Sequence, residues 1–143
     1  MREKAKKYFV VSALAAGLGV LVWRLATPLG PDAGYRVSVK VPDFSSLARA
    51  GKSAFDANCA VCHGPNASGT DHGPPLVHDI YNPGHHADEA FYLAAQRGVP
   101  RHHWRYGDMP PQLQVSREQM AAVIRYVREL QVANGVMYRQ HRM

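Results

Sequence analysis

The residues best suited to chemistry lie in one hexapeptide, CAVCHG at positions 59–64, which holds the only two cysteines of the chain. The cysteines are three positions apart and a histidine follows the second directly, which is the arrangement of a c-type haem attachment site. Two thiols at this spacing can each bond one vinyl group of the porphyrin edge, while the next residue directs an imidazole at the iron. We therefore predict one haem c, bound covalently through Cys59 and Cys62, with His63 as an axial iron ligand.

Two other uses of the cysteines compete with this interpretation. A dithiol redox motif usually begins a helix inside a βαβ pattern and has an acidified thiol, but no run of buried strands precedes Cys59. A zinc site would need two ligands besides Cys59 and Cys62, and without a second Cys-x-x-Cys these would come from histidines that lack finger-type spacing. The sequence favours haem over both.

The composition limits the class of protein. A chain of 143 residues supports one small domain. The formal net charge is +6, and half of this excess lies in the basic stretch at residues 2–7. Nucleic-acid binding is a poor explanation, because no lysine-rich stripe or recognised nucleic-acid-binding fold accompanies the charge. A mildly basic folded part instead suits docking to redox proteins with acidic faces.

The N-terminus predicts a membrane anchor. An apolar run of 16 residues, 8–23, follows the basic stretch, which is typical of a signal peptide or an anchor. Extended to Leu29, the run would form about 33 Å of helix, enough to cross a bilayer. No nearby position fits the small-residue pattern of a cleavage site well. We expect residues 1–29 to be an uncleaved transmembrane signal anchor of the cell (inner) membrane, with the remainder on the periplasmic, exported side.

The rest of the chain divides into a linker (30–44), a folded domain (45–135) and a loose C-terminal tail (136–143). Apolar and polar residues alternate over 35–41, but a lone strand would lack a partner, so we expect an extended tether lying on the domain surface.

Three helices are expected in the folded domain. The first begins at Asp43, Ser45 or Ser46 and runs into Cys59, and the second spans 87–97 with Gly98 just past its end. The third begins at Ser116, which with Gln119 resembles a capping box. The first helix has an apolar face made by Leu47, Gly51, Ala54 and Phe55. The third has one made by Met120, Val123, Ile124, Val127 and Leu130.

Together these features resemble the class I cytochromes c. The resemblance covers residues 47–132 and depends on Gly51-x-x-x-Phe55, the motif at 59–64, Gly73-Pro74-Pro75-Leu76, Asp108-Met109-Pro110-Pro111 and the last helix. It implies an all-α cytochrome c fold of three to four helices around one covalently bound haem, here preceded by the N-terminal transmembrane helix. It also implies that Gly51 meets the last helix around Tyr126, and that the Pro74 carbonyl accepts the Nδ1 proton of His63.

Met109 is the predicted second axial ligand, because a thioether stabilises ferrous iron and raises the potential. Two prolines follow Met109 and Gly107 precedes it, so the sulfur can be held in place. A packing role for Met109 remains an alternative, as does its replacement by His102 or His103, which would lower the potential. Met120 and Met137 are weaker candidates.

Six histidines between positions 72 and 103 are more than an electron carrier of this size needs. They are His72, His78, His85, His86, His102 and His103. Imidazole suits copper and zinc, but adjacent histidine pairs do not form a simple helical chelate, and surface loops often carry histidines that bind no metal. The sequence alone does not predict a second metal site.

The function expected from these patterns is single-electron transfer between respiratory redox partners by a membrane-tethered mono-haem cytochrome, which is not an enzyme. One alternative is a haem enzyme or gas sensor with a displaceable sixth ligand. Another is a cytochrome subunit of a larger oxidase or dehydrogenase.

Overall fold

The structure is a computed structural model that describes residues 17–19, 23 and 35–140. The chain divides into two compact units, Met1–Ala33 and Gly34–Met143, and the backbone of residues 17–19 and 23 is helical. In the described part of the chain, no helix combines the length and the apolar character needed to cross a bilayer. The expected anchor at 1–29 lies almost entirely outside the described residues and stays a prediction.

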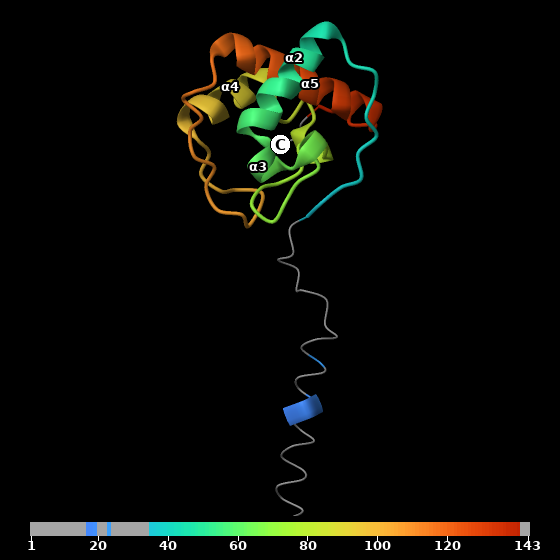
Figure 1. Ribbon diagram of the computed structural model, residues 1–143, viewed down its shortest axis with the longest axis vertical. Coiled ribbons are helices and arrows are strands. Elements are labelled where there is room, and N and C mark those ends of the chain that lie inside the picture. Colours follow the sequence, from blue (N-terminus) through green and yellow to red (C-terminus); the bar gives the residue numbers. More distant parts are fainter. Residues whose placement is uncertain (1–16, 20–22, 24–34, 141–143) are drawn as a thin grey trace, which may run out of the picture. The chain divides into compact units, whose positions relative to one another are not determined.

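The unit Gly34–Met143 is helical (Figure 1). Its helices are α2 (Ser46–Asn58), α3 (Ala60–His63), α4 (Asp88–Arg97) and α5 (Arg117–Ala133), with short 3-10 turns at Pro65–Ala67 and Asp79–Tyr81. Within residues 35–140 there is no strand, and an isolated antiparallel bridge joins Val99 to Met109. The predicted all-α class is therefore confirmed.

The crossing of α2 and α5 organises the core (Figure 1). A Cβ placed on Gly51 would lie 1.9 Å from the carbonyl oxygen of Ala122, so only glycine allows this approach of the two backbones. The crossing point is Ala122 and Val123, one turn before the expected Tyr126. Tyr126 is fully buried and packs against Phe55, with their ring centroids 5.4 Å apart.

The helix ends follow the sequence signals. Ser45 is the N-cap of α2, and its Oγ accepts a hydrogen bond from the Ala48 backbone N–H. Ser116 and Gln119 form the predicted capping box of α5, whose five expected apolar residues are all buried.

One expectation about the apolar face of α2 is wrong: Leu47 is 51% exposed while Ala48 is buried. The buried stripe of α2 runs through 48, 51 and 55, so Leu47 falls outside it.

The segments on either side of the helices also pack on the domain. Residues 35–45 have no regular secondary structure and contact the domain surface, as expected of a tether lying on it. The Val37 N–H donates to the Ser68 carbonyl at 2.9 Å, and the Lys40 N–H donates to Asn134 Oδ1 at 2.7 Å. The C-terminal segment differs from the expected loose tail: Val136 is buried, and Arg139 forms an ion pair with Asp79 at 2.8 Å.

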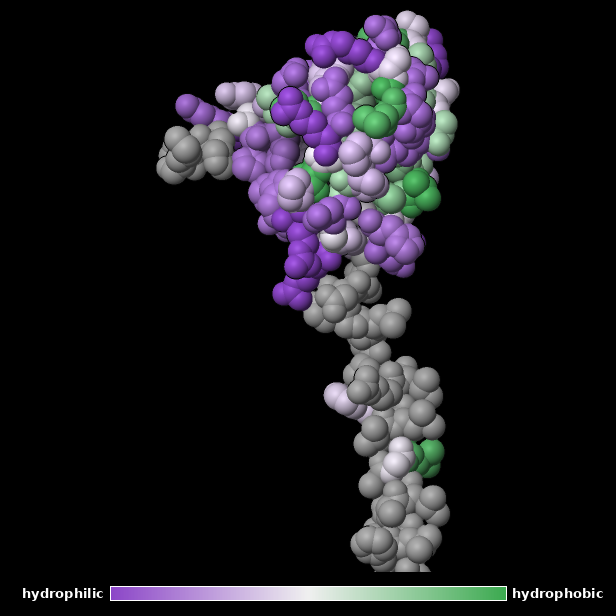
Figure 2. All heavy atoms as spheres, turned by 90° about the vertical axis from the view of Figure 1, so that its left-hand side faces the viewer, coloured by the Kyte–Doolittle hydropathy of each residue, from purple (hydrophilic) through white to green (hydrophobic). Residues whose placement is uncertain are grey.

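Figure 2 shows the side of the molecule that is on the left in Figure 1. Hydrophilic residues cover most of the folded unit there, with separate hydrophobic spots between them. Isolated exposed apolar side chains are normal for a protein surface, so this face gives no sign of a large apolar interface.

Candidate haem-binding site

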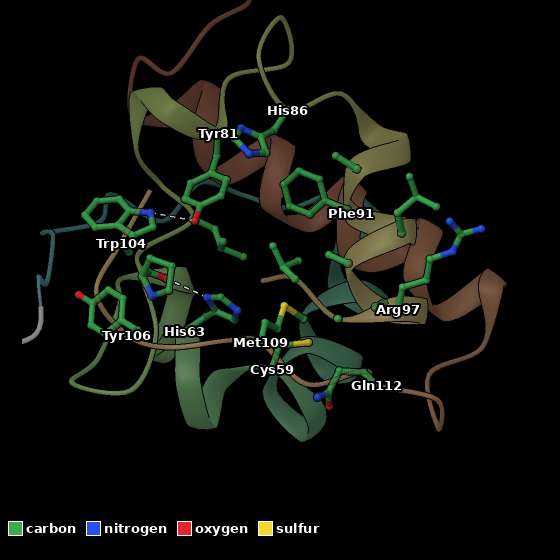
Figure 3. Close-up of a pocket in the computed structure, with 18 of the residues that line it drawn as sticks. Cys59, His63, Tyr81, His86, Phe91, Arg97, Trp104, Tyr106, Met109 and Gln112 are labelled. Carbon is green, nitrogen blue, oxygen red and sulfur yellow. Dashed lines mark hydrogen bonds between the residues drawn. The ribbon is translucent and has the colours of Figure 1, made fainter. Parts of the chain in front are cut away.

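A cavity of about 430 Å³ opens within the helical unit and has mostly apolar walls (Figure 3). Its size lies in the range of pockets that bind small molecules and cofactors, roughly 300–1,000 Å³. The walls come from the end of α2, from α3, α4 and α5, and from the segments before and after α4. Helices distant in sequence therefore enclose one apolar space with a few polar groups at its boundary.

The Cys-x-x-Cys-His motif lies at one wall of this cavity. Cys59 ends α2 and lines the cavity together with His63, whereas Cys62 is half-buried in α3 and is not among the lining residues. The two thiols do not form a disulfide. Burial, followed by the proximity of Cys62, raises the pKa of the Cys59 thiol to about 11. Dithiol redox sites instead depend on a lowered thiol pKa, so the dithiol interpretation is disfavoured.

A hydrogen bond to the backbone orients the imidazole of His63. Its Nδ1 lies 2.8 Å from the carbonyl oxygen of Pro74, the contact that the resemblance implied (Figure 3). This carbonyl can only accept, so Nδ1 carries the proton and Nε2 is left with a lone pair for a metal. Burial lowers the pKa of His63, opposed by the hydrogen bond to Pro74. The neutral ring that metal ligation requires is thereby favoured.

Backbone contacts on both sides keep the His63–Pro74 pair in place. Gly73 lies against Cys62, where an added Cβ would be 2.8 Å from the Cys62 carbonyl oxygen. The hydroxyl of Thr70 donates to the same oxygen at 2.5 Å. The loop that supplies the Pro74 carbonyl is thus fastened to the helix that carries His63.

Met109 lines the same cavity as His63. Two hydrogen bonds join it to Val99, which lies just after α4; they run from N–H to carbonyl in each direction, both at 2.9 Å. The next contact follows at Gln112, whose N–H donates to the Ala95 carbonyl at 2.7 Å. These bonds fix the backbone that carries Met109 next to α4, and its side chain lies at the cavity wall (Figure 3).

His102 and His103 line this cavity as well. The Nδ1 of His102 lies 2.9 Å from the Pro100 carbonyl oxygen, and Nε2 of His103 lies 3.3 Å from Nε2 of His85. The contact at Nδ1 leaves Nε2 of His102 with a lone pair, so hydrogen bonding does not separate the histidines from Met109. His102 and His103 are exposed, whereas Met109 is half-buried, which favours Met109 over either histidine as the second ligand.

A pairing of Tyr81 with Trp104 completes the wall and was not foreseen from the sequence. Trp104 Nε1 donates to the Tyr81 hydroxyl at 3.0 Å across 23 positions of sequence (Figure 3). Burial raises the pKa of Tyr81 to about 12, with the Trp104 bond acting against it and Tyr106 adding to it. Tyr81 therefore stays protonated and can still donate its own hydrogen. No local pattern links the two residues, because only the folded loops bring them together.

A zinc site at the cysteines finds no support. In the part of the chain that the structure describes, the one group of three or more potential metal-ligating side chains close enough to share an ion is His85, His86 and His103. Neither cysteine belongs to it. Cys59 and Cys62 therefore lack the two further ligands that tetrahedral zinc requires.

Comparison with known proteins agrees with this geometry. The model of the family described as "Cytochrome c" matches residues 48–131. The "Cytochrome bc1 complex cytochrome c subunit" of Mycobacterium leprae is 49% identical over 43 residues, which cover 29% of this chain and 15% of that protein. The subunits of the same name from Mycobacterium bovis and Mycobacterium tuberculosis are each 46% identical over 43 residues, with the same coverage. No solved structure gives a significant match.

The chain belongs to the cytochrome c family, since the family model covers more than half of it. It spans only about 15% of the length of the curated relatives it matches. Membership implies a covalently bound haem c and electron transfer as the function. The residues fit that cofactor: an apolar cavity has a thiol, a backbone-bonded imidazole and a thioether in its walls.

Proposed function

We propose that this protein is a class I, mono-haem cytochrome c that carries single electrons between respiratory redox partners. The observation that carries the proposal is the placement of His63 and Met109 around one apolar cavity whose wall includes Cys59. The chain contains one Cys-x-x-Cys-His motif and no further cysteine, which supports a single haem.

Four residues hold the cofactor in this proposal. Cys59 and Cys62 would form the thioether bonds, and Nε2 of His63 and the sulfur of Met109 would ligate the iron. When bound, the haem supplies an iron that alternates between the ferric and ferrous states. The Pro74 carbonyl orients His63, and the bridge to Val99 positions Met109. Because backbone contacts position both side chains, the iron would keep the same two ligands in both oxidation states, which favours outer-sphere electron transfer over binding of a substrate.

The apolar walls exclude water from the cofactor. Phe55, Leu76 and Val123 contribute to them and are buried in the core. Apolar burial of the metal site and a thioether ligand both act on the reduction potential. We expect a potential higher than that of a comparable site with two histidine ligands.

The partners in the proposal are redox proteins with acidic faces, at the exported side of the membrane. Arg97 and Arg101 are exposed and also border the cavity, and the Arg97 guanidinium points away from its centre (Figure 3). Positive charge at the rim would steer an acidic partner to the cofactor edge. The apolar run at 8–23 supports tethering by the N-terminal helix.

A second candidate is a cytochrome subunit of a larger respiratory complex. It is favoured by the 43-residue similarity to subunits named for the cytochrome bc1 complex. Purification from native membranes under mild detergent separates the two possibilities, because a free carrier elutes alone and a subunit elutes with partner chains in fixed ratio.

The axial ligands are tested by the spectrum of the ferric protein. A weak charge-transfer band at the red edge of the visible spectrum requires sulfur on the iron, so the wild type should show it and Met109→Ala should lack it. Met137→Ala, at an exposed position outside the cavity, should retain the band and serves as the matched control.

Carbon monoxide extends the same test to the alternative of an enzyme or gas sensor. The ferrous wild type should bind carbon monoxide slowly, and Met109→Ala should bind it rapidly. Rapid binding by the wild type would favour an open coordination position. A band that survives in Met109→Ala would refute Met109 as the ligand.

A further inference from the structure

Four histidines from two loops meet at the rim of the cavity. His85 and His86 lie in the loop before α4, and His102 and His103 lie in the loop after it. Nε2 of His85 is 3.3 Å from Nε2 of His103. The ring centroids of His102 and His103 are 4.3 Å apart, and those of His86 and His103 are 5.3 Å apart. The two pairs, separated by at least 16 positions, thus form one imidazole cluster, which we call the histidine cluster.

Two members of the histidine cluster are held in the manner of metal-ligating histidines. The Nδ1 of His86 lies 2.7 Å from the Ile80 carbonyl oxygen, and the Nδ1 of His102 lies 2.9 Å from the Pro100 carbonyl oxygen. A carbonyl accepts only, so Nδ1 is protonated and Nε2 has a lone pair in both rings. Metal-bound histidines nearly always have such a backbone or carboxylate partner on the second nitrogen, which fixes the tautomer.

The spacing of the nitrogens fits a tetrahedral ion. His85, His86 and His103 each have a ring nitrogen within 4.8 Å of those of the other two. Zinc–nitrogen bonds of about 2.0–2.1 Å at tetrahedral angles place neighbouring ligand atoms ~3.3 Å apart. The observed distance between Nε2 of His85 and Nε2 of His103 is 3.3 Å, and rotation of the exposed His103 side chain can bring its nitrogen closer to that of His86.

We propose that the histidine cluster is a second metal site, in which His85, His86 and His103 bind Zn²⁺ and His102 or water is the fourth ligand. Imidazole is a preferred donor for zinc. Burial, together with the neighbouring imidazoles, lowers the pKa of His86 and of His103, which favours the neutral form that binds metals. Arg101, next to His102, opposes a cation, so we expect weaker binding than at sites built from thiolates.

The histidine cluster connects the loop before α4 to the loop that ends at Met109. A metal there would clip the two loops together, since His86 and His103 both line the cavity and come from opposite sides of α4 in sequence. Closing such a loop removes conformational freedom from the segment that carries Met109. This site does not depend on the electron-transfer function, and its zinc is measured separately from the haem iron.

The test is equilibrium dialysis of the full-length, haem-loaded protein in detergent. The protein is purified without a polyhistidine tag and is treated with a chelator before dialysis. Elemental analysis after dialysis against Zn²⁺ at neutral pH should give about one zinc per iron, as for a single closed site. His85→Ala and His103→Ala should each weaken binding at least about tenfold, since perturbing even the outer contacts of such ligands costs 10–100-fold. His72→Ala removes an exposed histidine outside the histidine cluster and should leave the ratio unchanged.

X-ray absorption at the zinc edge of the wild type gives a measurement that needs no variant. It should show nitrogen neighbours at about 2.0–2.1 Å and no sulfur. Zinc that stays bound in the His85→Ala/His103→Ala double variant, absence of bound zinc in the wild type, or a sulfur shell would each overturn the proposal. Unchanged haem absorption in the variants shows that they are folded.

Discussion

Replacing Gly51 with alanine tests how the fold is held together, because it adds one methyl group where α2 crosses α5. That methyl would lie 1.9 Å from the Ala122 carbonyl oxygen and 2.9 Å from the Val123 nitrogen. Both obstacles are backbone atoms within α5, so no side-chain rotation relieves the clash. In an isolated helix the same change would stabilise the chain by up to about 1 kcal/mol. Helix propensity and packing therefore predict opposite signs for the change in the free energy of unfolding.

The size of the packing effect follows from the distance. Ordinary contact begins at 3.4 Å, so the two helices must separate by about 1.5 Å. A gap of 0.5–1 Å already loses a quarter to a half of the dispersion energy between facing atoms, and overpacking a core costs roughly 1–3 kcal/mol. The crossing also positions Phe55 against Tyr126. A clash with the backbone puts the packing cost near the upper end of this range, so we expect Gly51→Ala to lower the free energy of unfolding by about 2 kcal/mol after the gain in helix propensity.

The assay is guanidinium unfolding of the haem-loaded protein, followed in parallel by far-ultraviolet circular dichroism and haem absorption. Ala50→Gly is the matched control, because Ala50 is the exposed neighbour of Gly51 in α2. It should cost about 1 kcal/mol through helix propensity alone. A Gly51→Ala protein as stable as the wild type, or more stable, would refute the close crossing.

Two further substitutions test contacts between elements. Glu129 accepts from the Ser45 N–H at 3.0 Å, the Ser45 hydroxyl at 2.7 Å and Arg125 at 2.6 Å; although burial acts the other way, these bonds lower its pKa. A carboxyl group whose pKa is lower in the folded than in the unfolded protein stabilises the fold at pH values above its unfolded-state pKa of about 4.3. This stabilisation is lost as the pH falls through the pKa of the folded state. Glu129→Gln should therefore lower the free energy of unfolding by about 1 kcal/mol at neutral pH, and by progressively less below about pH 4. Urea titrations at several pH values measure this, with Glu89→Gln at an exposed position as the control. A cost that does not change with pH would contradict the role of the charge. Gln131 is buried, and its Nε2 donates to the Leu76 carbonyl at 2.9 Å. Gln131→Leu should lower the free energy of unfolding by about 1–3 kcal/mol, because that carbonyl loses its donor. An unchanged denaturation midpoint would show that the bond contributes nothing.

The sequence predicted the features that depend on local chemistry. The capping box of α5 needs only Ser116 and Gln119, three residues apart, and the structure has it. The end of α4 at Gly98 follows from a backbone φ of +72° that glycine adopts freely. The contact of His63 with Pro74 was implied by the resemblance, and the structure shows it at 2.8 Å. The identities of the haem ligands remain predictions.

Contacts between distant segments could not be predicted in the same way. Leu47 is more apolar than Ala48, but the direction of the buried stripe depends on where α5 lies. The position of Arg139 depends on a carboxylate, Asp79, 60 residues earlier in the chain. In the sequence the two histidine pairs are separate. In the fold, the two loops around α4 bring Nε2 of His85 within 3.3 Å of Nε2 of His103. Each case depends on a contact between distant segments, which a local pattern does not encode.

The most direct test of the proposed cytochrome is the intact mass of the mature, exported protein after denaturation and extraction with acidified organic solvent. Thioether bonds survive this treatment, whereas a haem held only by coordination is released. The proposal predicts the polypeptide mass plus one haem, with a Cys59→Ala/Cys62→Ala variant losing all of its colour to the solvent. A wild-type protein that gives the bare polypeptide mass would contradict it.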